Sequence, residues 1–323
     1  MAEKVNQAWT FADVARLSDR EIYGKTLVSL GTTNKNIVVL GSDLMYSNRT
    51  SDFLEKFPER AFNFGVAEQN MMGAAAGFAT CGKIVFVSTF AAFASMRACE
   101  QVRTDICYPN LNVKIVATHS GLTMGSGGTT HHATEDIAIV RSFANLTVIV
   151  PADAIETEKA VRAAVEHEGP VYIRLGRAAE RLVFQNGYPY DFKIGKAITL
   201  KSGKDVTLIA TGLEVYESII ASDILGKKGI DVGVINMHTI KPIDEETIIN
   251  AAQNSKLLVT VEEHNVIGGL GSAVCEVVAE KCPVRVLRIG IPDVFTVIGS
   301  PEDLKDRYGL TGDKIAEKII SIL

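Results

Sequence analysis

The sequence predicts an α/β protein built from two doubly wound domains. Short β-rich runs alternate with helical stretches, which is typical of parallel βαβ units. The alternation stops once and then resumes, and 323 residues are enough for two domains with separate cores. We expect the first domain over residues 1–180, a linker over residues 181–196 and a smaller second domain over residues 197–323.

The first domain is predicted from five short apolar strands with helices between them. The expected strands are Ile37–Leu40, Ile84–Val87, Val113–Ala117, Thr147–Val150 and Val171–Leu175. The expected helices include Arg20–Gly31, Gln69–Thr80, Ala91–Ile106 and Ala154–Glu166. Asp153 precedes the last of these and can cap it.

A second alternation follows a stretch without periodicity, in which Asn186, Gly187 and Pro189 mark a linker. The expected elements are the strands Val206–Thr211, Asp231–Asn236, Leu257–Glu262 and Val284–Ile289, and the helical segments Glu214–Lys227, Asp244–Asn254 and Gly268–Cys282. The glycines at 268–271 lack a full GxGxxG pattern, so they predict a tight helix entry and not a dinucleotide site.

The composition argues against several classes of protein. Hydrophobic residues make up 47% and charged residues 22%, which describes a globular protein. No apolar run reaches the length of a membrane span and the first residues lack a secretory signal, so we expect a cytoplasmic protein. Five cysteines without CxxC spacing predict reduced thiols in or near the core. A net charge of -5 without a basic stripe argues against nucleic acid as a partner.

The stretch FNFGVAEQNMMG, residues 62–73, places the carboxylate of Glu68 where an apolar strand passes into a helix of small residues. A glutamate in a first turn can simply offset the helix dipole. The helix that follows, MMGAAAGF, could be packed on every side and supplies no local salt-bridge partner. We therefore expect Glu68 to be partly desolvated and suited to sharing a proton with a ligand.

Histidine and phenylalanine side chains follow two of the expected strands at their carboxyl ends, where ligands bind in parallel sheets. His119 precedes a glycine-rich segment that contains His131 and His132, and the spacing of the three does not match a zinc site. We expect contacts to a polar substrate. Phe90 and Phe93 have a spacing common in cores, yet rings at a strand end can also stack on a flat heterocycle.

The order of these motifs resembles the transketolase family of thiamine diphosphate enzymes. SDLMYSN, FNFGVAEQN, STFAAF, ATHSGLTMGSGGTTHH, PADAIET and VYIRLGR are similar to its pyrimidine-binding domain, and VEEHNVIGGLGSA is similar to its carboxyl-terminal domain. The resemblance implies that Glu68 bonds a ring nitrogen of the cofactor's aminopyrimidine and tunes its protonation. It also implies that Phe90 and Phe93 pack around that ring, and that Asp43 and Leu44 line the same pocket.

The resemblance further implies recognition of sugar phosphates. Arg20, Ser47 and Arg177 match family positions that bind a substrate phosphate, which suits guanidinium and hydroxyl donors. His119 and His131 match histidines at the donor and acceptor oxygens.

The glycine-rich loop departs from the family. Gly127 stands where ordinary transketolases carry an aspartate that contacts a donor hydroxyl. We therefore expect a donor other than the common xylulose or fructose phosphate, such as a branched, deoxy or anionically substituted sugar.

A missing motif predicts a partner chain. The family holds its diphosphate through Mg²⁺ on a Gly-Asp-Gly motif, and this chain has none, so we expect no metal ligands here. The resemblance, which covers the carboxyl-terminal half of a full transketolase, implies a partner subunit carrying the diphosphate domain and Mg²⁺. The simplest such assembly is a heterotetramer.

Other functions stay open on the sequence alone. The beta subunit of a 2-oxo acid or acetoin dehydrogenase has the same two domains and the same glutamate, with a lipoyl-protein acceptor in place of the sugar. Deoxyxylulose phosphate synthase fits less well because it normally carries all its domains in one chain. A non-catalytic scaffold on the same fold is the third alternative.

Overall fold

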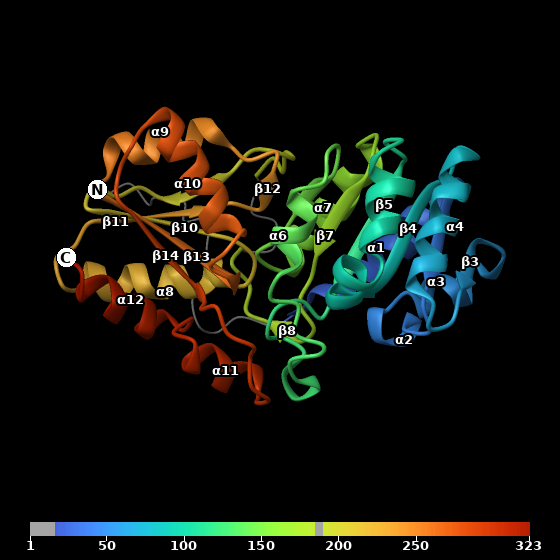
Figure 1. Ribbon diagram of the computed structural model, residues 1–323, viewed down its shortest axis with the longest axis horizontal. Coiled ribbons are helices and arrows are strands. Elements are labelled where there is room, and N and C mark those ends of the chain that lie inside the picture. The colour runs from blue at the N-terminus through green and yellow to red at the C-terminus, as the bar shows by residue number, and fades with distance from the viewer. Residues whose placement is uncertain (1–16, 185–189) are drawn as a thin grey trace, which may run out of the picture.

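The protein forms two α/β halves that lie side by side (Figure 1). The computed structural model describes residues 17–184 and 190–323. The first sixteen residues of the expected first domain, and residues 185–189 of the expected linker, lie outside the described residues.

A seven-stranded sheet forms the first half. In sheet order its strands are β12 (Thr239–Lys241), β6 (Thr147–Ile149), β7 (Val171–Arg174), β5 (Val113–Thr118), β4 (Ile84–Phe90), β2 (Ile37–Gly41) and β3 (Ala61–Asn63). All neighbouring strands are parallel except β12, which is antiparallel to β6. Every residue of β2, β5, β6 and β7 is buried, as expected for parallel strands covered on both faces.

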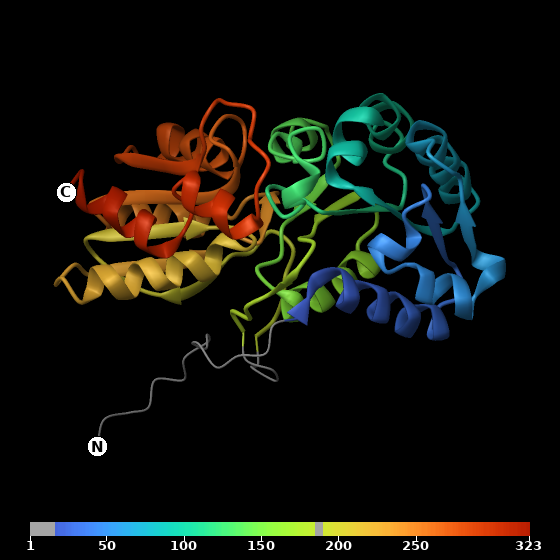
Figure 2. The same ribbon diagram turned by 90° about the horizontal axis from the view of Figure 1, so that it is seen from below.

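Helices cover both faces of this sheet (Figure 2). The helices α1 (Asp19–Thr33) and α7 (Ala154–Glu166) contact each other and pack on one face. On the other face lie α4 (Glu68–Thr80) and α6 (Asp136–Arg141), together with α5 (Cys99–Gln101) and the π-helical segments η2 (Phe93–Arg97) and η3 (Val102–Cys107). One continuous helix was expected over Ala91–Ile106. The π-helical turns interrupt it, because the Ala98 N–H bonds the carbonyl of Phe93, five residues back.

The second half is a five-stranded sheet between two helical layers. Its strands, in sheet order, are β14 (Val286–Ile291), β13 (Leu257–Asn265), β10 (Val206–Ala210), β11 (Val232–Asn236) and β9 (Ile198–Lys201), of which only β9 is antiparallel to its neighbour. Figure 1 shows α9 (Glu245–Asn254) and α10 (Leu270–Lys281) on one side of it, and α8 (Glu214–Gly226) and α12 (Gly312–Ile320) on the other.

Several short elements were not expected from the sequence. They are β1 (Leu17–Ser18), which pairs with β8 (Ala179–Glu180), the edge strand β9, the helices α2 (Met45–Asn48), α3 (Ser51–Lys56), α11 (Pro301–Arg307) and α12, and the 3₁₀ turns η1 (Pro58–Arg60) and η4 (Gly125–Gly127). The strand β12 was also missed. It lies after the expected linker but belongs to the first sheet.

The two halves share contacts along the loop between β5 and α6. The Asn265 N–H donates to the Thr134 carbonyl at 2.8 Å, and Arg174 Nη2 donates to the Glu263 carbonyl at 3.1 Å. The buried cluster beneath α4 and α6 continues under α9 and α10. The loop that carries the predicted substrate residues is therefore held by both halves.

Two further predictions concern thiols and membranes. Cys107 is buried and three other cysteines are half-buried, but Cys81 is exposed, so it is not a core thiol. It lies just past the end of α4, where the chain turns toward β4. Within the described residues, no helix combines the length and apolar character needed to cross a bilayer.

Candidate active site

Glu68 is the first residue of α4 and is almost completely buried, with 1% of its surface exposed. The β3 strand ends at Asn63 and a short turn leads into the helix, so the carboxylate lies near the carboxyl ends of β2 and β4. Only one face of α4 is buried, through Met71, Met72, Ala75 and Ala76. In this chain alone the helix is not packed on every side.

Arg97 is the ionic partner that the sequence did not reveal. Its Nη1 lies 2.8 Å from Glu68 Oε2, and its guanidinium group lies over the Phe93 ring at 4.0 Å from the ring centroid. Arg97 ends the π-helical segment η2, far along the chain from Glu68, so local sequence could not show the pair. Among the residues that the structure describes, the only hydrogen-bond partner of Glu68 Oε1 is the Ser42 hydroxyl, at a long 3.4 Å. That oxygen retains hydrogen-bonding capacity for a ligand.

Aromatic rings line the space beside Glu68. Phe90 and Phe93 stack with 5.8 Å between their centroids. The His119 ring lies 4.0 Å from Phe90, and the His131 ring meets the edge of Phe93 at 5.3 Å. The structure therefore brings together both phenylalanines and both predicted histidines. Flat apolar faces next to a buried carboxylate suit a polar heterocycle.

Asp43 and Leu44 follow β2 and approach the site from its edge. Asp43 adopts a positive φ of 59° and is exposed, and its backbone N–H donates to Asn63 Oδ1 at 2.8 Å. Leu44 is half-buried and precedes α2. The Asn63 amide nitrogen also donates to Asp43 Oδ1 at 3.3 Å, so the Asp43 side chain is held at the end of β3.

His119 is buried and lies among cations. The Thr118 hydroxyl donates to Asn48 Oδ1 at 2.7 Å and lies 2.9 Å from His119 Nδ1, so this nitrogen carries the proton and Nε2 has the free lone pair. Burial, and then the charges of Arg20 and Arg177, lower the pKa of His119 to about 3. The ring is therefore neutral at pH 7 and accepts hydrogen bonds through Nε2.

The predicted phosphate-binding residues come from three segments around His119. Arg20, in the first turn of α1, donates from Nη1 to the Ser47 carbonyl at 2.7 Å. Arg177 follows β7 and donates to the Met124 carbonyl at 3.3 Å. Both guanidinium groups act electrostatically on His119, and the hydroxyl of Ser47 is half-buried beside them. Cations and a hydroxyl group thus gather on one side of the imidazole.

Gly127 lies in the loop between β5 and α6, within the turn η4. A Cβ atom at this position would come 2.5 Å from Met124 Cγ and 3.4 Å from His131 Cβ. The flexible methionine therefore fills the space that a side chain at residue 127 would need. This packing brings no carboxylate to the substrate side of the loop.

His132 serves the structure of the loop. Its Nε2 lies 2.9 Å from the Gly125 carbonyl, so it donates there, and its Nδ1 accepts from the Thr296 hydroxyl at 2.6 Å. Thr296 belongs to the segment between β14 and α11 in the second half. His132 therefore joins the substrate loop to the carboxyl-terminal half, whereas His131 faces the aromatic rings.

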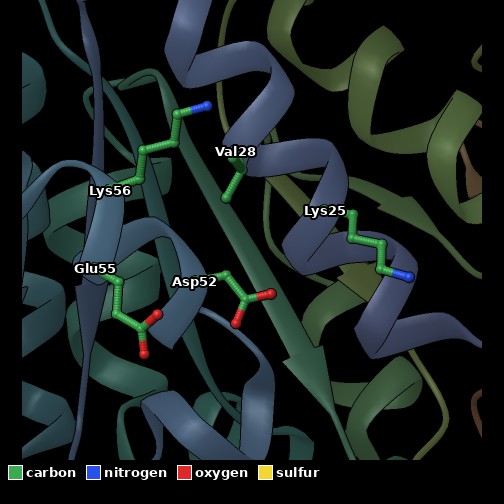
Figure 3. A pocket seen from close by; sticks show the side chains of 5 residues that line it. All are labelled: Lys25, Val28, Asp52, Glu55 and Lys56. Carbon is green, nitrogen blue, oxygen red and sulfur yellow. The ribbon is translucent and has the colours of Figure 1, made fainter.

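A separate groove of about 430 Å³ lies between α1 and α3, away from these residues (Figure 3). It is lined by Lys25, Val28, Asp52, Glu55 and Lys56. Two ammonium groups and two carboxylates balance in charge, and Lys56 donates to a threonine of α1. We assign no ligand to this groove.

The residues present fit one part of thiamine diphosphate. The buried carboxylate with a free acceptor oxygen and the stacked phenylalanines suit an aminopyrimidine ring. By contrast, no cluster of three His, Cys, Asp or Glu side chains suited to a metal ion occurs among residues 17–184 and 190–323. The nearest approach to Gly-Asp-Gly in the sequence is Gly312-Asp313-Lys314, which begins α12 in the second half and not a turn after a strand.

Comparisons with known proteins agree with this fold. Residues 16–181 match the transketolase pyrimidine-binding domain and residues 195–315 match the transketolase C-terminal domain. These matches cover most of the chain, so the chain belongs to the transketolase family.

Several of its relatives are chains of similar length. A protein of Methanocaldococcus jannaschii named as a transketolase C-terminal section is 49% identical over 93% of this chain and 95% of its own length. A 6-deoxy-6-sulfo-D-fructose transketolase subunit of Clostridium sp. is 42% identical over 92% of this chain and 91% of its own. A solved split-gene transketolase, described as an inactive beta4 tetramer, has a TM-score of 0.86 at 48% identity, covering 95% of this chain and 98% of its own.

Proposed function

We propose that this chain is the carboxyl-terminal subunit of a two-chain, thiamine diphosphate-dependent transketolase. It would transfer a two-carbon ketol unit from a ketose phosphate to an aldose phosphate, and only when assembled with an amino-terminal subunit. The observation that carries this proposal is the site at Glu68. One buried carboxylate, a stacked aromatic pair and two arginines beside a neutral histidine lie at one edge of one sheet.

Glu68 would hold the aminopyrimidine. Its Oε1 is available to share a proton with a ring nitrogen, while Arg97 fixes Oε2 and neutralises the buried charge. Phe90 and Phe93 would pack against the ring and exclude water from the carboxylate. When bound, thiamine diphosphate supplies the carbon nucleophile that takes up and passes on the ketol unit.

The histidines and arginines would place the sugar. Arg20, Arg177 and Ser47 would bind the phosphate, because guanidinium groups match its oxygens. His119 Nε2 would accept a hydrogen bond from a sugar hydroxyl, and His131 would face a second oxygen from across the aromatic wall. Burial first, and then the two arginine charges, lower the pKa of His119, and a bound phosphate would offset the contribution of the arginines.

The partner would supply the diphosphate site. Relatives of similar length are named as a transketolase C-terminal section and as a transketolase subunit, and this chain has no Gly-Asp-Gly motif. We infer that the amino-terminal subunit holds the diphosphate through Mg²⁺ and that two chains of each type form a heterotetramer. The split-gene neighbour is described as an inactive beta4 tetramer, which supports the need for a partner.

The donor would differ from the common ketose phosphates. Met124 occupies the space next to Gly127, so the loop presents no carboxylate to a donor hydroxyl. A branched, deoxy or anionically substituted ketose fits this uncharged wall better. The Clostridium relative is named for a sulfonated fructose, so donors other than the ordinary ketose phosphates occur among similar chains. For this chain we expect a donor that keeps its phosphate group.

Reconstitution with the amino-terminal subunit, thiamine diphosphate and Mg²⁺ tests the proposal. Two-carbon transfer should appear only with both chains, and the isolated chain should not bind the cofactor tightly. Glu68→Gln should assemble normally but lower kcat by about 100-fold or more, whereas the exposed Glu55→Gln should not change it. Unchanged turnover in the Glu68 variant would favour the scaffold alternative.

Donor turnover separates the remaining alternatives. Branched, deoxy and sulfonated ketoses are compared with xylulose and fructose phosphates in the reconstituted enzyme. A clear preference for the ordinary phosphates would contradict the donor proposal. Decarboxylation of pyruvate by the same complex would instead indicate a 2-oxo acid dehydrogenase subunit.

A further inference from the structure

Arg49 brings a third guanidinium group to the substrate site. It follows α2, two residues after Ser47, and its Nη2 lies 3.0 Å from Glu21 Oε1 on the first turn of α1. Arg20, the neighbour of Glu21, reaches across to the Ser47 carbonyl. Burial first, and then the charges of Arg49 and Arg177, lower the pKa of Arg20. The three cations are thus close enough to repel one another.

The backbone at Arg49 adopts a conformation that its side chain does not favour. Arg49 has a φ of 64°, in the left-handed region. The other non-glycine residues with positive φ in the described segments are aspartate, asparagine or histidine, types that adopt this region more readily. The left-handed backbone is the C-cap of α2, a position that glycine or asparagine usually takes, so an arginine there is a reason to look for a role of its side chain.

Two buried donors of this cluster have no partner. Arg20 Nε and Arg49 Nε are both inaccessible to solvent and make no hydrogen bond with any of residues 17–184 and 190–323. Buried guanidinium N–H groups are costly when unsatisfied, and an anion with several acceptor oxygens would satisfy them. The cluster is therefore arranged for a ligand with negative charge.

The charges of the cluster indicate which anion it fits. Three guanidinium groups and the Glu21 carboxylate leave two net positive charges beside His119, which is neutral at pH 7. A phosphate monoester carries close to two negative charges at this pH. A sulfonate carries one. The electrostatics therefore favour the phosphate.

We propose that Arg49 is a third anion-binding residue of the substrate site and that it makes this site selective for phosphorylated sugars over sulfonated ones. The inference rests on the proposed function, because it assigns the acidic end of the sugar to Arg20, Ser47 and Arg177. The inference adds Arg49 to these residues, and it adds a preference of the site for phosphate over sulfonate. Glu21 limits the effect by holding one face of the Arg49 guanidinium.

Binding of inorganic phosphate and of methanesulfonate tests this inference. Both are titrated calorimetrically at about pH 8, where phosphate is a dianion, into the full chain alone and into its complex with the partner and cofactor. Arg49→Asn removes the charge and suits the left-handed backbone, so it should fold at least as well as the wild type. Its phosphate affinity should fall by about tenfold, with a smaller loss for methanesulfonate.

Two further variants serve as an opposite test and a control. Glu21→Gln should tighten phosphate binding by about threefold, because it frees Arg49 and removes a negative charge. Arg162→Asn removes an equally exposed arginine that pairs with Glu158 on α7, and it should leave the affinity within about twofold. If the Arg49–Glu21 pair had a purely structural role, Arg49→Asn and Glu21→Gln would not change the phosphate affinity in opposite directions.

The outcomes distinguish this inference from the function on which it rests. If Arg49→Asn binds phosphate like the Arg162 control while Arg177→Asn loses binding, the inference is overturned and the phosphate site stands. If Arg177→Asn also binds normally, the phosphate site itself is misplaced. Equal losses of phosphate and methanesulfonate in Arg49→Asn would overturn the proposed selectivity.

Discussion

Arg174→Met tests the ionic centre that joins the two halves. Arg174 ends β7, and its Nε lies 2.9 and 3.1 Å from the two carboxylate oxygens of Asp136. Its Nη2 donates to the carbonyls of Ala133 and Glu263 at 3.0 and 3.1 Å. The Tyr172 hydroxyl donates to the same carboxylate at 2.9 Å. Methionine keeps much of the volume but removes every one of the arginine's hydrogen bonds.

The expected loss is large because both charges are buried. Arg174 is 5% exposed and Asp136 is fully buried, so the variant leaves a carboxylate in the core with one remaining donor. Breaking a buried pair on one side typically costs about 3–5 kcal/mol of unfolding free energy. Adding Asp136→Asn to Arg174→Met removes the buried charge that the first substitution leaves without a partner. The double variant should therefore be more stable than Arg174→Met by about 1 kcal/mol or more.

Urea unfolding at pH 7, followed by circular dichroism at one protein concentration, measures these differences. Arg162→Met, which breaks an exposed pair on α7, is the control and should change stability by less than about 0.5 kcal/mol. The reasoning would be refuted if Arg174→Met lost less than about 1 kcal/mol, or if the double variant lost the sum of the two single changes.

Three other predictions concern single positions. A Cβ atom at Gly24 would collide with a backbone carbonyl, so Gly24→Ala should destabilise the chain by about 1–3 kcal/mol. Gly226 has open space around it, so Gly226→Ala should not destabilise the chain. Equal midpoints of urea unfolding for the two variants would contradict this prediction. Burial raises the pKa of Glu156 from 4.5 to about 8. Between these two pH values the folded state keeps a proton that the unfolded state has lost. The free energy of unfolding should therefore fall as the pH rises from about 4.5 to about 8. Glu156→Gln should flatten that slope when the unfolding midpoint is followed across this range, and an unchanged slope would count against the assignment. Thr296→Val leaves His132 Nδ1 buried without its donor and should lower the free energy of unfolding by about 1–3 kcal/mol. Backbone amides of the substrate loop should also exchange faster in this variant. Slower or equal exchange would contradict the role of His132 in joining the loop to the second half.

Much of the fold could be predicted because its strands are apolar and fully buried. Each of the five strands expected in the first half exists in the structure, and α7 begins and ends at the expected residues. The prediction failed where local pattern does not control the outcome. Residues 239–241 form a strand only because the edge of β6 accepts them, and the helix after β4 is interrupted by π-helical turns. Both outcomes depend on packing between distant segments.

The candidate site was predicted as a set of residues but not as a set of contacts. The motifs placed Glu68, Phe90, Phe93 and His119 correctly at the carboxyl edge of the sheet. The Arg97 partner of Glu68 was missed, because the two residues are joined by tertiary structure and no spacing rule connects them. A search for arginines near the aromatic motif could have suggested it. Arg49 gave no sequence signal, because its strained backbone shows only in the structure.

The strand β12 has a practical consequence for anyone who divides this chain. It comes from beyond the linker, yet it covers the outer edge of β6, where Val150 N–H donates to the His238 carbonyl at 2.7 Å. A fragment cut at the linker would lack this strand and expose the apolar edge of β6 to other molecules, which is a common start of aggregation. The complementary fragment would carry the strand without a sheet to join. The two halves match two different domains of the family, but the chain should be expressed as one piece.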